Sequence, residues 1–537
     1  MKTYILSALV SLFFINAVYA EEATLVVKEV GTKHYKTIVV DATEIEKIKI
    51  SDLYESVEEE VWLKAPKTVT KKRKARTNKA TSQNLQSNSI QSAGEQIPND
   101  PELSLQYYFQ DKSLYEGSSE ILKAMTKSVQ NKKLRIAVID GGFEDHEDLE
   151  WAYGYNFFRE WGEVRGPEFR DLTEEQKMCT GGHGLGVASI IGAKSNNGIG
   201  ISGIVNGEMI ALRALSCGIG PLSGVADAIL HAAGAEVDDI PVIPQVDMIN
   251  ISMGGELPSC PSYLQDAIDY ANGKGIMIFV AAGNQNVDAN GVVPAQCKGI
   301  FVTGATEQSG YKTEFSNYGS KVDAMAAGYD VIGYSSDGIL GWWEGTSQAS
   351  PLALGIAALG LQHNPDLSRE ELFTYLKVTA DSIREDVPSS DQDCTGDRCG
   401  TGLLNADSFM DYVVASTNGG VYKLRHALSS DTSCDQMLYL SQLGNTLPLC
   451  QMYELVIADG EGGSTNEMQL VRVSKGEAML EENTEFIVST FEKVVLLEDI
   501  DNEAYDYGIR VCSDELCENT PIIKVETDEA FLPAVCQ

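Results

Sequence analysis

The stretch Gly345–Pro351 reads GTSQASP and runs directly into an apolar segment from Leu352 to Leu361. A turn of small residues followed by an apolar run predicts a buried helix with Ser347 in its first turn. Pro351 agrees with a helix start, because proline is tolerated where its missing N–H has no partner to lose. Unpaired backbone N–H groups and the positive end of the helix dipole would let Ser347 attack a carbonyl and stabilise the oxyanion. The alternative is an ordinary helix start capped by Thr346 or Ser347.

Upstream of this helix, from Leu134 onward, the sequence alternates β-rich and helical runs. The run Arg135–Ile139 is nearly continuous in apolar and β-branched residues, which is typical of a parallel sheet covered on both faces. The alternation predicts an α/β fold, a mostly parallel sheet with helices on both faces and functional residues beyond the carboxyl ends of the strands. The other predicted strands are 208–214, 246–252, 276–281 and 300–303, and the predicted helices are 185–191, 225–233 and 263–272.

Two residues that a serine nucleophile needs occupy matching places in this pattern. Asp140 ends the first predicted strand, and His183 stands in Gly-Gly-His-Gly at the start of an apolar helix. A histidine can take the proton from Ser347 and give it to the leaving amine, while an aspartate fixes the imidazole tautomer. Taken singly, Asp140 reads equally well as a turn residue and His183 as a satisfied polar residue.

Four short motifs follow one another in the chain, each at a predicted strand end or helix start. They are Asp140-Gly141-Gly142, His183-Gly184, Ala281-Ala282-Gly283-Asn284 and Gly345-Thr346-Ser347. Together they resemble the signatures of the subtilase family of subtilisin-like serine peptidases, whose triad has the same order, Asp, His, Ser. The resemblance runs from about residue 98 to about residue 414. It implies a subtilisin-like fold with Asp140, His183 and Ser347 as the catalytic residues.

The resemblance assigns further residues around the nucleophile. It implies that the side-chain amide of Asn284 and the backbone N–H of Ser347 form the oxyanion hole. It also implies that a peptide substrate is bound in extended form, as an added β-strand. The substrate-binding residues so implied are Ser252, Met253, Gly254, Ala281 and Gly283 on one side and Leu222 and Gly224 on an opposite strand. A core strand ending in a glycine turn is the alternative, and it is compatible with this role.

The segment 196–200 resembles a calcium-binding loop of the same family. Calcium prefers oxygen ligands from carboxylates, amides and backbone carbonyls. The ligands so implied are Asp148, the side chain of Asn197, and the carbonyls of Ser195, Ile199 and Ile201. An Asn-Gly turn without a metal is the alternative. No organic cofactor is expected.

Three positions depart from the usual family motifs. Leu185-Gly186 stands where Thr-His is usual, and Gln348-Ala349-Ser350 stands where the nucleophile is usually followed by Met-Ala-Ala. Gly141-Gly142 stands where a Thr or Ser is common. None of these departures removes a proton-transfer group.

The ends of the chain differ from its centre in composition. Residues 1–20 carry Lys2, an apolar core and a small-residue end, which predict a cleaved secretory signal rather than a membrane span. Residues 21–97 predict a small α/β propeptide, with β-rich runs at 24–27, 36–40 and 47–50, followed by a basic linker centred on Lys71–Arg76. Residues 98–415 would be the catalytic domain. Residues 416–537 predict a β-rich C-terminal domain with strands at 468–473, 485–491, 507–512 and 521–525.

Charge and cysteine content restrict the classes of partner and compartment. The formal net charge of −37 divides into +2 for residues 1–97 and −39 for the remainder. Such a body repels nucleic acid and attracts cationic partners, although solubility alone is the alternative reason for it. All eleven cysteines lie at or beyond Cys179, and an exported protein oxidises many of them. The spacing would let Cys394 pair with Cys399, and Cys512 with Cys517, leaving at least one thiol of the odd total free or paired elsewhere.

These observations predict a secreted serine endopeptidase, made as a pre-pro-enzyme, that hydrolyses peptide bonds through an acyl-enzyme intermediate. The expected partners are a protein or peptide substrate and the chain's own propeptide as an inhibitor, with no nucleic acid and no stable membrane span. One alternative is a catalytically silent relative that acts as a binding or chaperone module. Another is a narrow-specificity protease that matures one co-secreted partner.

Overall fold

The computed structural model describes most of the chain between residues 98 and 417 and parts of the regions on either side. The described ranges are 22–29, 35–41, 48–49, 54–64, 98–160, 163–171, 173–238, 240–384 and 387–417, together with separate strands between 422 and 519. The predicted signal, the basic linker and the predicted strand 521–525 lie outside the described residues.

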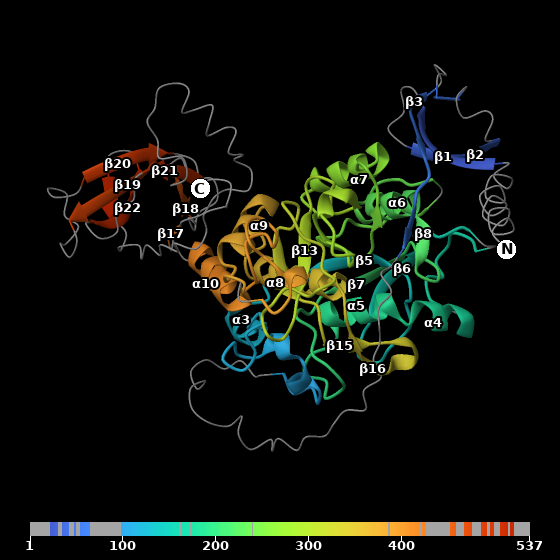
Figure 1. The fold of residues 1–537 in the computed structure, drawn as a ribbon, viewed down its shortest axis with the longest axis horizontal. Coiled ribbons are helices and arrows are strands. Elements are labelled where there is room, and N and C mark those ends of the chain that lie inside the picture. Colours follow the sequence, from blue (N-terminus) through green and yellow to red (C-terminus); the bar gives the residue numbers. More distant parts are fainter. Residues whose placement is uncertain are drawn as a thin grey trace, which may run out of the picture.

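A seven-stranded sheet forms the centre of the molecule (Figure 1). Its strand order is β14-β13-β11-β9-β5-β7-β6, and every neighbouring pair is parallel. The predicted α/β class is therefore confirmed. The strands are β5 (Arg135–Asp140), β6 (Trp151–Asn156), β7 (Glu208–Arg213), β9 (Met248–Ile251), β11 (Met277–Ala281), β13 (Phe301–Thr306) and β14 (Ala324–Ala327).

Five of these strands match the predicted runs, and the two edge strands were not predicted. The edge strand β6 is half-exposed and rich in Tyr and Gly, so it lacks the continuous apolar run of a central strand. The opposite edge, β14, reads AMAA and has no β-branched residue. Both strands form because a paired neighbour satisfies their backbone groups, which is information the local sequence does not carry.

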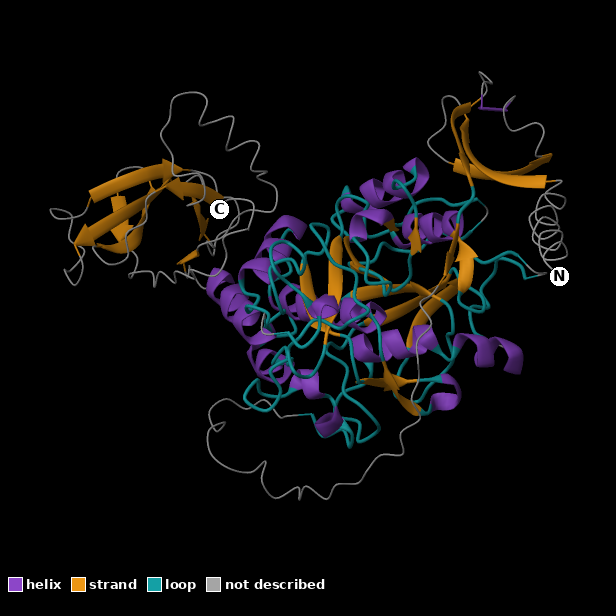
Figure 2. Ribbon diagram, in the orientation of Figure 1, coloured by secondary structure: helices purple, strands orange, loops and turns teal. Residues whose placement is uncertain are grey.

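Helices cover both faces of the sheet (Figure 2). Alternate residues of β5 show this division, because Ile136 and Val138 lie in one apolar core while Ala137 and Ile139 lie in the other. The first core is covered by α5 (His183–Gly192) and α8 (Thr346–His363), and the second by α6 (Leu222–Ala232) and α7 (Ser262–Asn272). The remaining helices are α3 (Ile121–Lys127), α4 (Glu174–Thr180), α9 (Arg369–Val378) and α10 (Ala406–Thr417).

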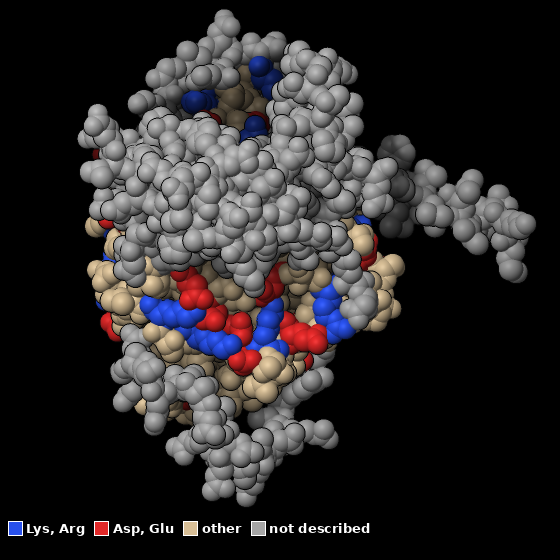
Figure 3. Space-filling model, turned by 90° about the vertical axis from the view of Figure 1, so that its left-hand side faces the viewer, with Lys and Arg blue, Asp and Glu red and all other residues tan. Residues whose placement is uncertain are grey.

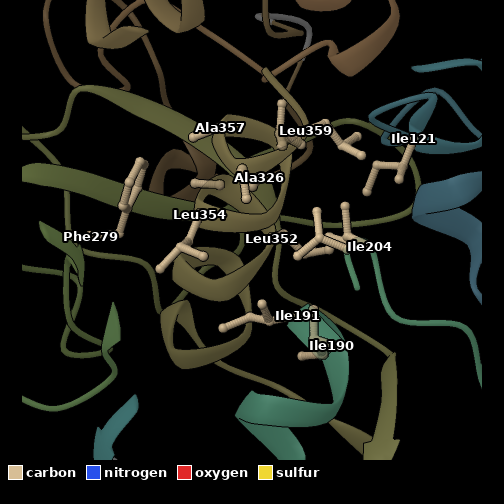
Figure 4. Close-up of a cluster of buried hydrophobic side chains, with 14 of the residues drawn as sticks. Ile121, Ile190, Ile191, Ile204, Phe279, Ala326, Leu352, Leu354, Ala357 and Leu359 are labelled. Atoms are coloured by element: carbon tan, nitrogen blue, oxygen red, sulfur yellow. The ribbon is translucent and has the colours of Figure 1, made fainter. Parts of the chain in front are cut away.

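The helix that contains Ser347, α8, is buried along its whole length. All 18 residues of α8 are buried, and it packs on β9, β11, β13, β14 and α5. Figure 4 shows Leu352, Leu354 and Leu359 of α8 among apolar side chains of other elements, including Ile190 and Ile191 of α5. Burying a leucine side chain of this kind contributes about 1.5–3 kcal/mol. The predicted helix is confirmed, and its first turn is thereby fixed in the core.

Short strands and turns connect the main elements. They are β8 (Ile219–Pro221), β10 (Gly255–Glu256), β12 (Val292–Val293), β15 (Val331–Tyr334) and β16 (Leu340–Trp343), with 3-10 turns at 103–105, 107–109, 289–291, 336–338 and 390–392.

The N-terminal region forms an antiparallel sheet of its own. It contains β1 (Glu22–Glu29), β2 (Tyr35–Asp41) and β3 (Tyr54–Glu59) in the order β2-β1-β3. The predicted run 47–50 is wrong as a strand, because Ile48 and Lys49 are helical and β3 takes the place beside β1. The next strand, β4 (Trp62–Lys64), leaves this sheet and pairs antiparallel with β8 of the main body.

Seven strands are described in the C-terminal region, in two antiparallel sheets of order β17-β18-β21 and β20-β19-β22-β23. Three of them fall on the predicted runs that begin at residues 468, 485 and 507. They are β17 (Tyr422–Arg425), β18 (Met452–Ile457), β19 (Glu467–Ser474), β20 (Glu485–Thr490), β21 (Val494–Glu498), β22 (Tyr505–Ser513) and β23 (Leu516–Asn519). Cys512 and Cys517 are register partners in β22 and β23, and their side chains lie outside the described residues.

Three disulfides are present in the described residues. Cys394–Cys399 closes the predicted tight loop, so that prediction is confirmed. Cys179–Cys217 and Cys260–Cys297 join segments distant in sequence and were not predicted.

Figure 3 shows basic and acidic side chains alternating in a band on one face, and ion pairs such as Lys123–Asp111 and Lys127–Asp407 join α3 to its surroundings. Within the described part of the chain, no helix is both long and apolar enough to cross a bilayer.

Candidate active site

Asp140 and His183 meet at the carboxyl end of the sheet. Asp140 is the last residue of β5, and His183 is the first residue of α5. The His183 Nδ1 atom lies 2.8 Å and 3.0 Å from the two carboxylate oxygens of Asp140, and both side chains are almost fully buried. A buried carboxylate at this distance fixes the imidazole with its proton on Nδ1. The Nε2 atom is then left as the basic nitrogen.

That Nε2 atom is buried and has no hydrogen-bond partner among the described residues. Leaving a polar atom unpaired in the interior costs about 1–3 kcal/mol, so such atoms are few in native proteins. The ring of Trp343 lies edge-on against the imidazole, at 5.9 Å between centroids. The arrangement therefore holds the ring in place on two sides and leaves its basic nitrogen available to accept a proton.

The glycines of the Asp and His motifs are explained by close approaches around this pair. Gly142 has φ of +78°, and a Cβ there would lie 2.7 Å from the backbone nitrogen of His183. Gly186 faces Trp343, whose ring would lie 3.0 Å from an added Cβ. The unusual Gly141-Gly142 and Leu185-Gly186 sequences thus agree with the packing of Asp140, His183 and Trp343.

Ser347 lies in the first turn of α8, at the start of the buried helix. Its Oγ donates a hydrogen bond to the carbonyl oxygen of Ser252 at 3.2 Å, and the residue is fully buried. Helix α5, which begins at His183, packs against α8. The serine hydroxyl is thus held beside the end of β9. Catalytic hydrogen bonds in free enzymes often become short only when substrate is bound.

A chain of buried hydrogen bonds lies behind Ser347. The Ser350 Oγ donates to the Asn250 side-chain oxygen at 2.7 Å, and the Asn250 amide donates to the Ser252 Oγ at 2.9 Å. The Ser252 Oγ in turn donates to the carbonyl oxygen of Ser347 at 2.9 Å. All four residues are fully buried. The chain ties the first turn of α8 to strand β9 through side chains that have no exposure to solvent.

Asn284 follows β11 and faces the start of α8. Its side-chain oxygen accepts hydrogen bonds from the Thr346 N–H at 2.9 Å and the Thr346 hydroxyl at 2.8 Å. Because the oxygen is engaged twice, the amide group must point its N–H donors away from Thr346. The residue is partly exposed. The two bonds therefore fix the side chain with its N–H groups directed away from Thr346.

Gln348 was noted in the sequence only as a departure from the family motif. In the structure it is fully buried next to Ser347, and neither its amide nitrogen nor its amide oxygen has a partner among the described residues. Its signal in the sequence was a polar residue in an otherwise apolar helix. Ser350 was noted only as part of the same departure, and Trp343 and Asn250 were not singled out, because their contacts connect elements far apart in the chain.

The predicted substrate-binding residues fall in two groups. Ser252, Met253 and Gly254 follow β9, and Ala281 and Gly283 stand at the end of β11, so these strand ends lie together. Their side chains are largely enclosed, and Ser252 faces the α8 start rather than solvent. The prediction that Leu222 and Gly224 lie on the opposite strand is wrong. The strand that precedes them is β8 (Ile219–Pro221), which ends at Pro221, and Leu222 begins α6.

The residues predicted to bind calcium also come together. Asp148 is fully buried, and Asn197 donates from its side-chain nitrogen to an Asp148 carboxylate oxygen at 2.6 Å. The Asn197 side-chain oxygen accepts from the Ile199 N–H at 2.8 Å. The described part of the chain contains no group of three or more His, Cys, Asp or Glu side chains arranged to hold a metal ion. The side-chain atoms predicted as ligands are thus engaged with donors of the protein.

Comparison with known proteins gives a consistent result. Residues 131–405 match the model of the subtilase family. The chain is 33% identical over 350 residues to an extracellular protease of Xanthomonas campestris pv. campestris, covering 60% of this chain and 57% of that protein. It is 35% identical over 253 residues to a thermophilic serine proteinase of a Bacillus species, covering 46% and 56%.

A solved structure described as proteases from Pseudoalteromonas arctica aligns with a TM-score of 0.53 at 29% identity, covering 59% of this chain and 100% of that one. The chain spans about half the length of the curated relatives that it matches.

Proposed function

The chain belongs to the subtilase family, and on that basis we propose that it is a serine endopeptidase acting on peptide bonds through Asp140, His183 and Ser347. The observation that carries the proposal is the buried Asp140–His183 pair with its unpaired Nε2 atom, together with Ser347 in the first turn of α8, the helix that packs against α5. An unpaired basic nitrogen in a buried site is costly, which makes it a candidate for a functional group.

In the proposed reaction, the Ser347 Oγ attacks the carbonyl carbon of the scissile peptide bond. His183 Nε2 takes the hydroxyl proton as the Oγ–C bond forms, and Asp140 stabilises the resulting imidazolium. The same nitrogen then gives the proton to the leaving amine as the C–N bond breaks. Water repeats the sequence on the acyl-enzyme and releases the carboxylic acid.

Charge on the oxyanion would be stabilised by the Asn284 amide and the Ser347 N–H. Support comes from the two hydrogen bonds that Thr346 donates to the Asn284 oxygen, because they leave the amide N–H groups as the free donors. The N–H groups at the start of α8 have no partner within the helix. Both donors are fixed before substrate arrives, which is what electrostatic stabilisation of a transition state requires.

We further propose that the propeptide blocks the substrate groove. Strand β4 pairs with β8 in antiparallel register, with Leu63 opposite Gly220. Leu63 is fully buried, the Val61 carbonyl accepts from the Leu222 N–H at 2.7 Å, and the Glu60 carboxylate accepts from the Ser223 N–H at 3.1 Å. A peptide bound in extended form as an added strand would occupy the same edge. The N-terminal sheet must therefore leave before β8 can bind a substrate.

We also propose that the chain is exported and is then matured by cleavage. Relatives with matching sequence are named extracellular proteases, and the first 20 residues have the composition of a secretory signal. Cleavage within residues 65–97 would separate β4 and the sheet preceding it from the catalytic body. The basic residues of this segment offer sites for a protease that prefers Lys or Arg.

The test compares the full-length wild type with Ser347→Ala and Ser350→Ala, using intact mass and a fluorophosphonate probe. The wild type and Ser350→Ala are expected to lose their first ~80–100 residues and to take one probe molecule. That length is set by the linker, whose basic composition marks an accessible segment. Ser347→Ala is expected to stay long and unlabelled. Ser350 is the matched control, because it lies in the same helix turn and is equally buried.

Two other outcomes would favour the alternatives. A folded, processed wild type that takes no probe and cleaves no peptide would make the chain a binding or chaperone module. A wild type that takes the probe but cleaves none of a panel of unfolded proteins would point to a protease restricted to one partner.

A further inference from the structure

Tyr334 makes a close contact with the loop that the sequence marked for calcium. It is the last residue of β15, and its hydroxyl donates to an Asp148 carboxylate oxygen at 2.5 Å. Tyr334 is 2% exposed and Asp148 is fully buried. The tyrosine ring also stacks on His146, with 3.7 Å between ring centroids. The Tyr334 side chain is therefore held in position twice, by the stacking of its ring on His146 and by the hydrogen bond from its hydroxyl to Asp148.

The hydroxyl lies inside the loop. A Cβ added to Gly200 would lie only 1.7 Å from the Tyr334 oxygen, so the loop can close over the hydroxyl only with glycine at that position. Gly200 thus lies against an oxygen atom of the protein at the place where the sequence predicted ligands for a cation.

The side-chain oxygens of Asp148 and Asn197 are paired with donors of the protein. One Asp148 oxygen accepts from Tyr334, and the other accepts from the Asn197 amide. The Asn197 side-chain oxygen accepts from the Ile199 N–H. Turning the Asn197 amide over would set its oxygen against the Asp148 carboxylate and lose the bond from Ile199, so its orientation is determined by both neighbours.

Asp100 lies outside the loop, and its carboxylate also accepts hydrogen bonds from the loop. Its carboxylate accepts from the backbone N–H of Asn196 at 3.0 Å. Calcium takes six to eight oxygen ligands at about 2.3–2.6 Å. Here the loop instead directs N–H and O–H donors at the oxygens of Asp100, Asp148 and Asn197. The residues present do not fit a calcium ion.

We propose that the Tyr334 hydroxyl takes the position of a cation in this loop and makes it a metal-independent clamp. The clamp joins the loop 195–201, Asp148 and the end of β15. It also reaches the site already described, because β15 pairs with β16, whose last residue, Trp343, packs against His183. The Tyr334 N–H donates to Ser189 of α5 at 3.2 Å, so the same strand end is tied to the helix that starts at His183.

The test measures thermal unfolding of the full chain in the Ser347→Ala background, which prevents self-digestion. Each variant is melted in excess EDTA and in excess calcium chloride. With Tyr334 intact, calcium is expected to leave the midpoint unchanged. Tyr334→Phe is expected to melt about 2–8 °C lower in EDTA, because Asp148 loses a donor, and to recover part of this shift in calcium. Tyr263→Phe is the matched control, because Tyr263 is equally buried and its hydroxyl has no partner among the described residues.

The Asp148→Asn variant shows whether any effect of calcium on the midpoint arises from this loop or from another part of the chain. The proposal is supported if Tyr334→Phe gains a calcium response that Tyr263→Phe lacks and that Asp148→Asn abolishes in the double variant. It is overturned if, with Tyr334 intact, calcium raises the midpoint and Asp148→Asn removes that rise, because the loop would then bind calcium with the tyrosine in place. It is equally overturned if Tyr334→Phe and Tyr263→Phe have the same midpoint of thermal unfolding in both solutions.

Discussion

Two buried carboxylates, Asp140 and Asp148, lie in the same stretch of chain and have opposite surroundings. Each is almost fully buried, and each accepts a hydrogen bond from an aromatic side chain, His183 for Asp140 and Tyr334 for Asp148. The partner of Asp140 carries a second nitrogen with no hydrogen-bond partner among the described residues. Both Asp148 oxygens, by contrast, are paired, one with Asn197 of the loop and the other with Tyr334 of β15.

Hydrogen-bond pairing separates a candidate reactive site from a structural one. An unpaired buried polar atom costs about 1–3 kcal/mol, so each such atom is a candidate for contact with a substrate. A fully paired cluster stabilises the fold and has nothing left to offer a substrate. On this basis, changes around Asp140 should alter rate with little effect on stability, and changes around Asp148 should do the reverse.

The largest expected contrast is between Asp140→Asn and Asp148→Asn. Asp140→Asn should lower kcat by roughly 10⁴-fold, because the imidazole would no longer be held in the required tautomer. Asp148→Asn should lower the free energy of unfolding by about 1–3 kcal/mol, since Asn197 would face a second amide, and should leave kcat/KM nearly unchanged. Peptide hydrolysis and urea unfolding of both variants check this. Equal losses of rate in the two would refute the distinction.

Asn284→Asp should have the next largest effect. The aspartate keeps an oxygen for the two donors of Thr346 but removes the amide N–H groups that would meet the oxyanion. We expect kcat to fall by about 10²–10³-fold, a magnitude measured on subtilisin, a member of this family, rather than derived from this structure. The KM should change little. A variant with normal kcat would show that Asn284 serves only to cap α8.

Ser350→Ala tests whether a fully paired network can still affect rate by positioning. Removing its hydroxyl leaves the Asn250 oxygen without that donor and loosens the chain that ends at Ser347. We expect kcat to fall by about 3–10-fold with KM unchanged, since small displacements of reacting groups are costly. Ser128→Ala is the control, because it loses one similar bond, to the Leu359 carbonyl, without contact to the site. Both should lose about 1 kcal/mol of stability, but only Ser350→Ala should be slower.

His231 is a buried residue with polar atoms that are unpaired in the described part of the chain, and it lies away from the candidate active site. Both of its ring nitrogens are unpaired among the described residues, yet the side chain is fully enclosed by Tyr153, Tyr155 and Phe157. Burial lowers the pKa of His231 to about 4. Between pH 6.5 and 4 the unfolded chain therefore binds a proton that the folded chain does not, so stability falls as pH decreases through this window.

His231→Phe should remove this acid sensitivity and leave activity unchanged. The expected gain at pH 4.5 relative to pH 7 is at most roughly 3 kcal/mol, which is the pKa difference from an ordinary histidine converted to free energy. Midpoints of thermal unfolding at the two pH values, in the Ser347→Ala background, measure it. An unchanged pH dependence would mean that His231 is not the group responsible.

Much of the fold was predictable because its signals are local. The central strands carry continuous β-branched runs, and Ser347 stands between a small-residue turn and an apolar helix. Five sheet strands and the helices α5, α6, α7 and α8 follow from such patterns. The edge strands β6 and β14 did not, because their sequences become strands only when a neighbour pairs with them.

The family, the α/β class, the candidate triad residues and the Cys394–Cys399 loop can all be read from the amino-acid sequence, since each depends on the order or spacing of nearby residues. The hydrogen bond from Tyr334 to Asp148 and the pairing of Cys179 with Cys217 are visible only in the folded chain. The position of β4 beside β8 is likewise visible only there. These contacts join residues far apart in the chain, and burial and pairing in the folded state select among partners that local patterns leave equivalent.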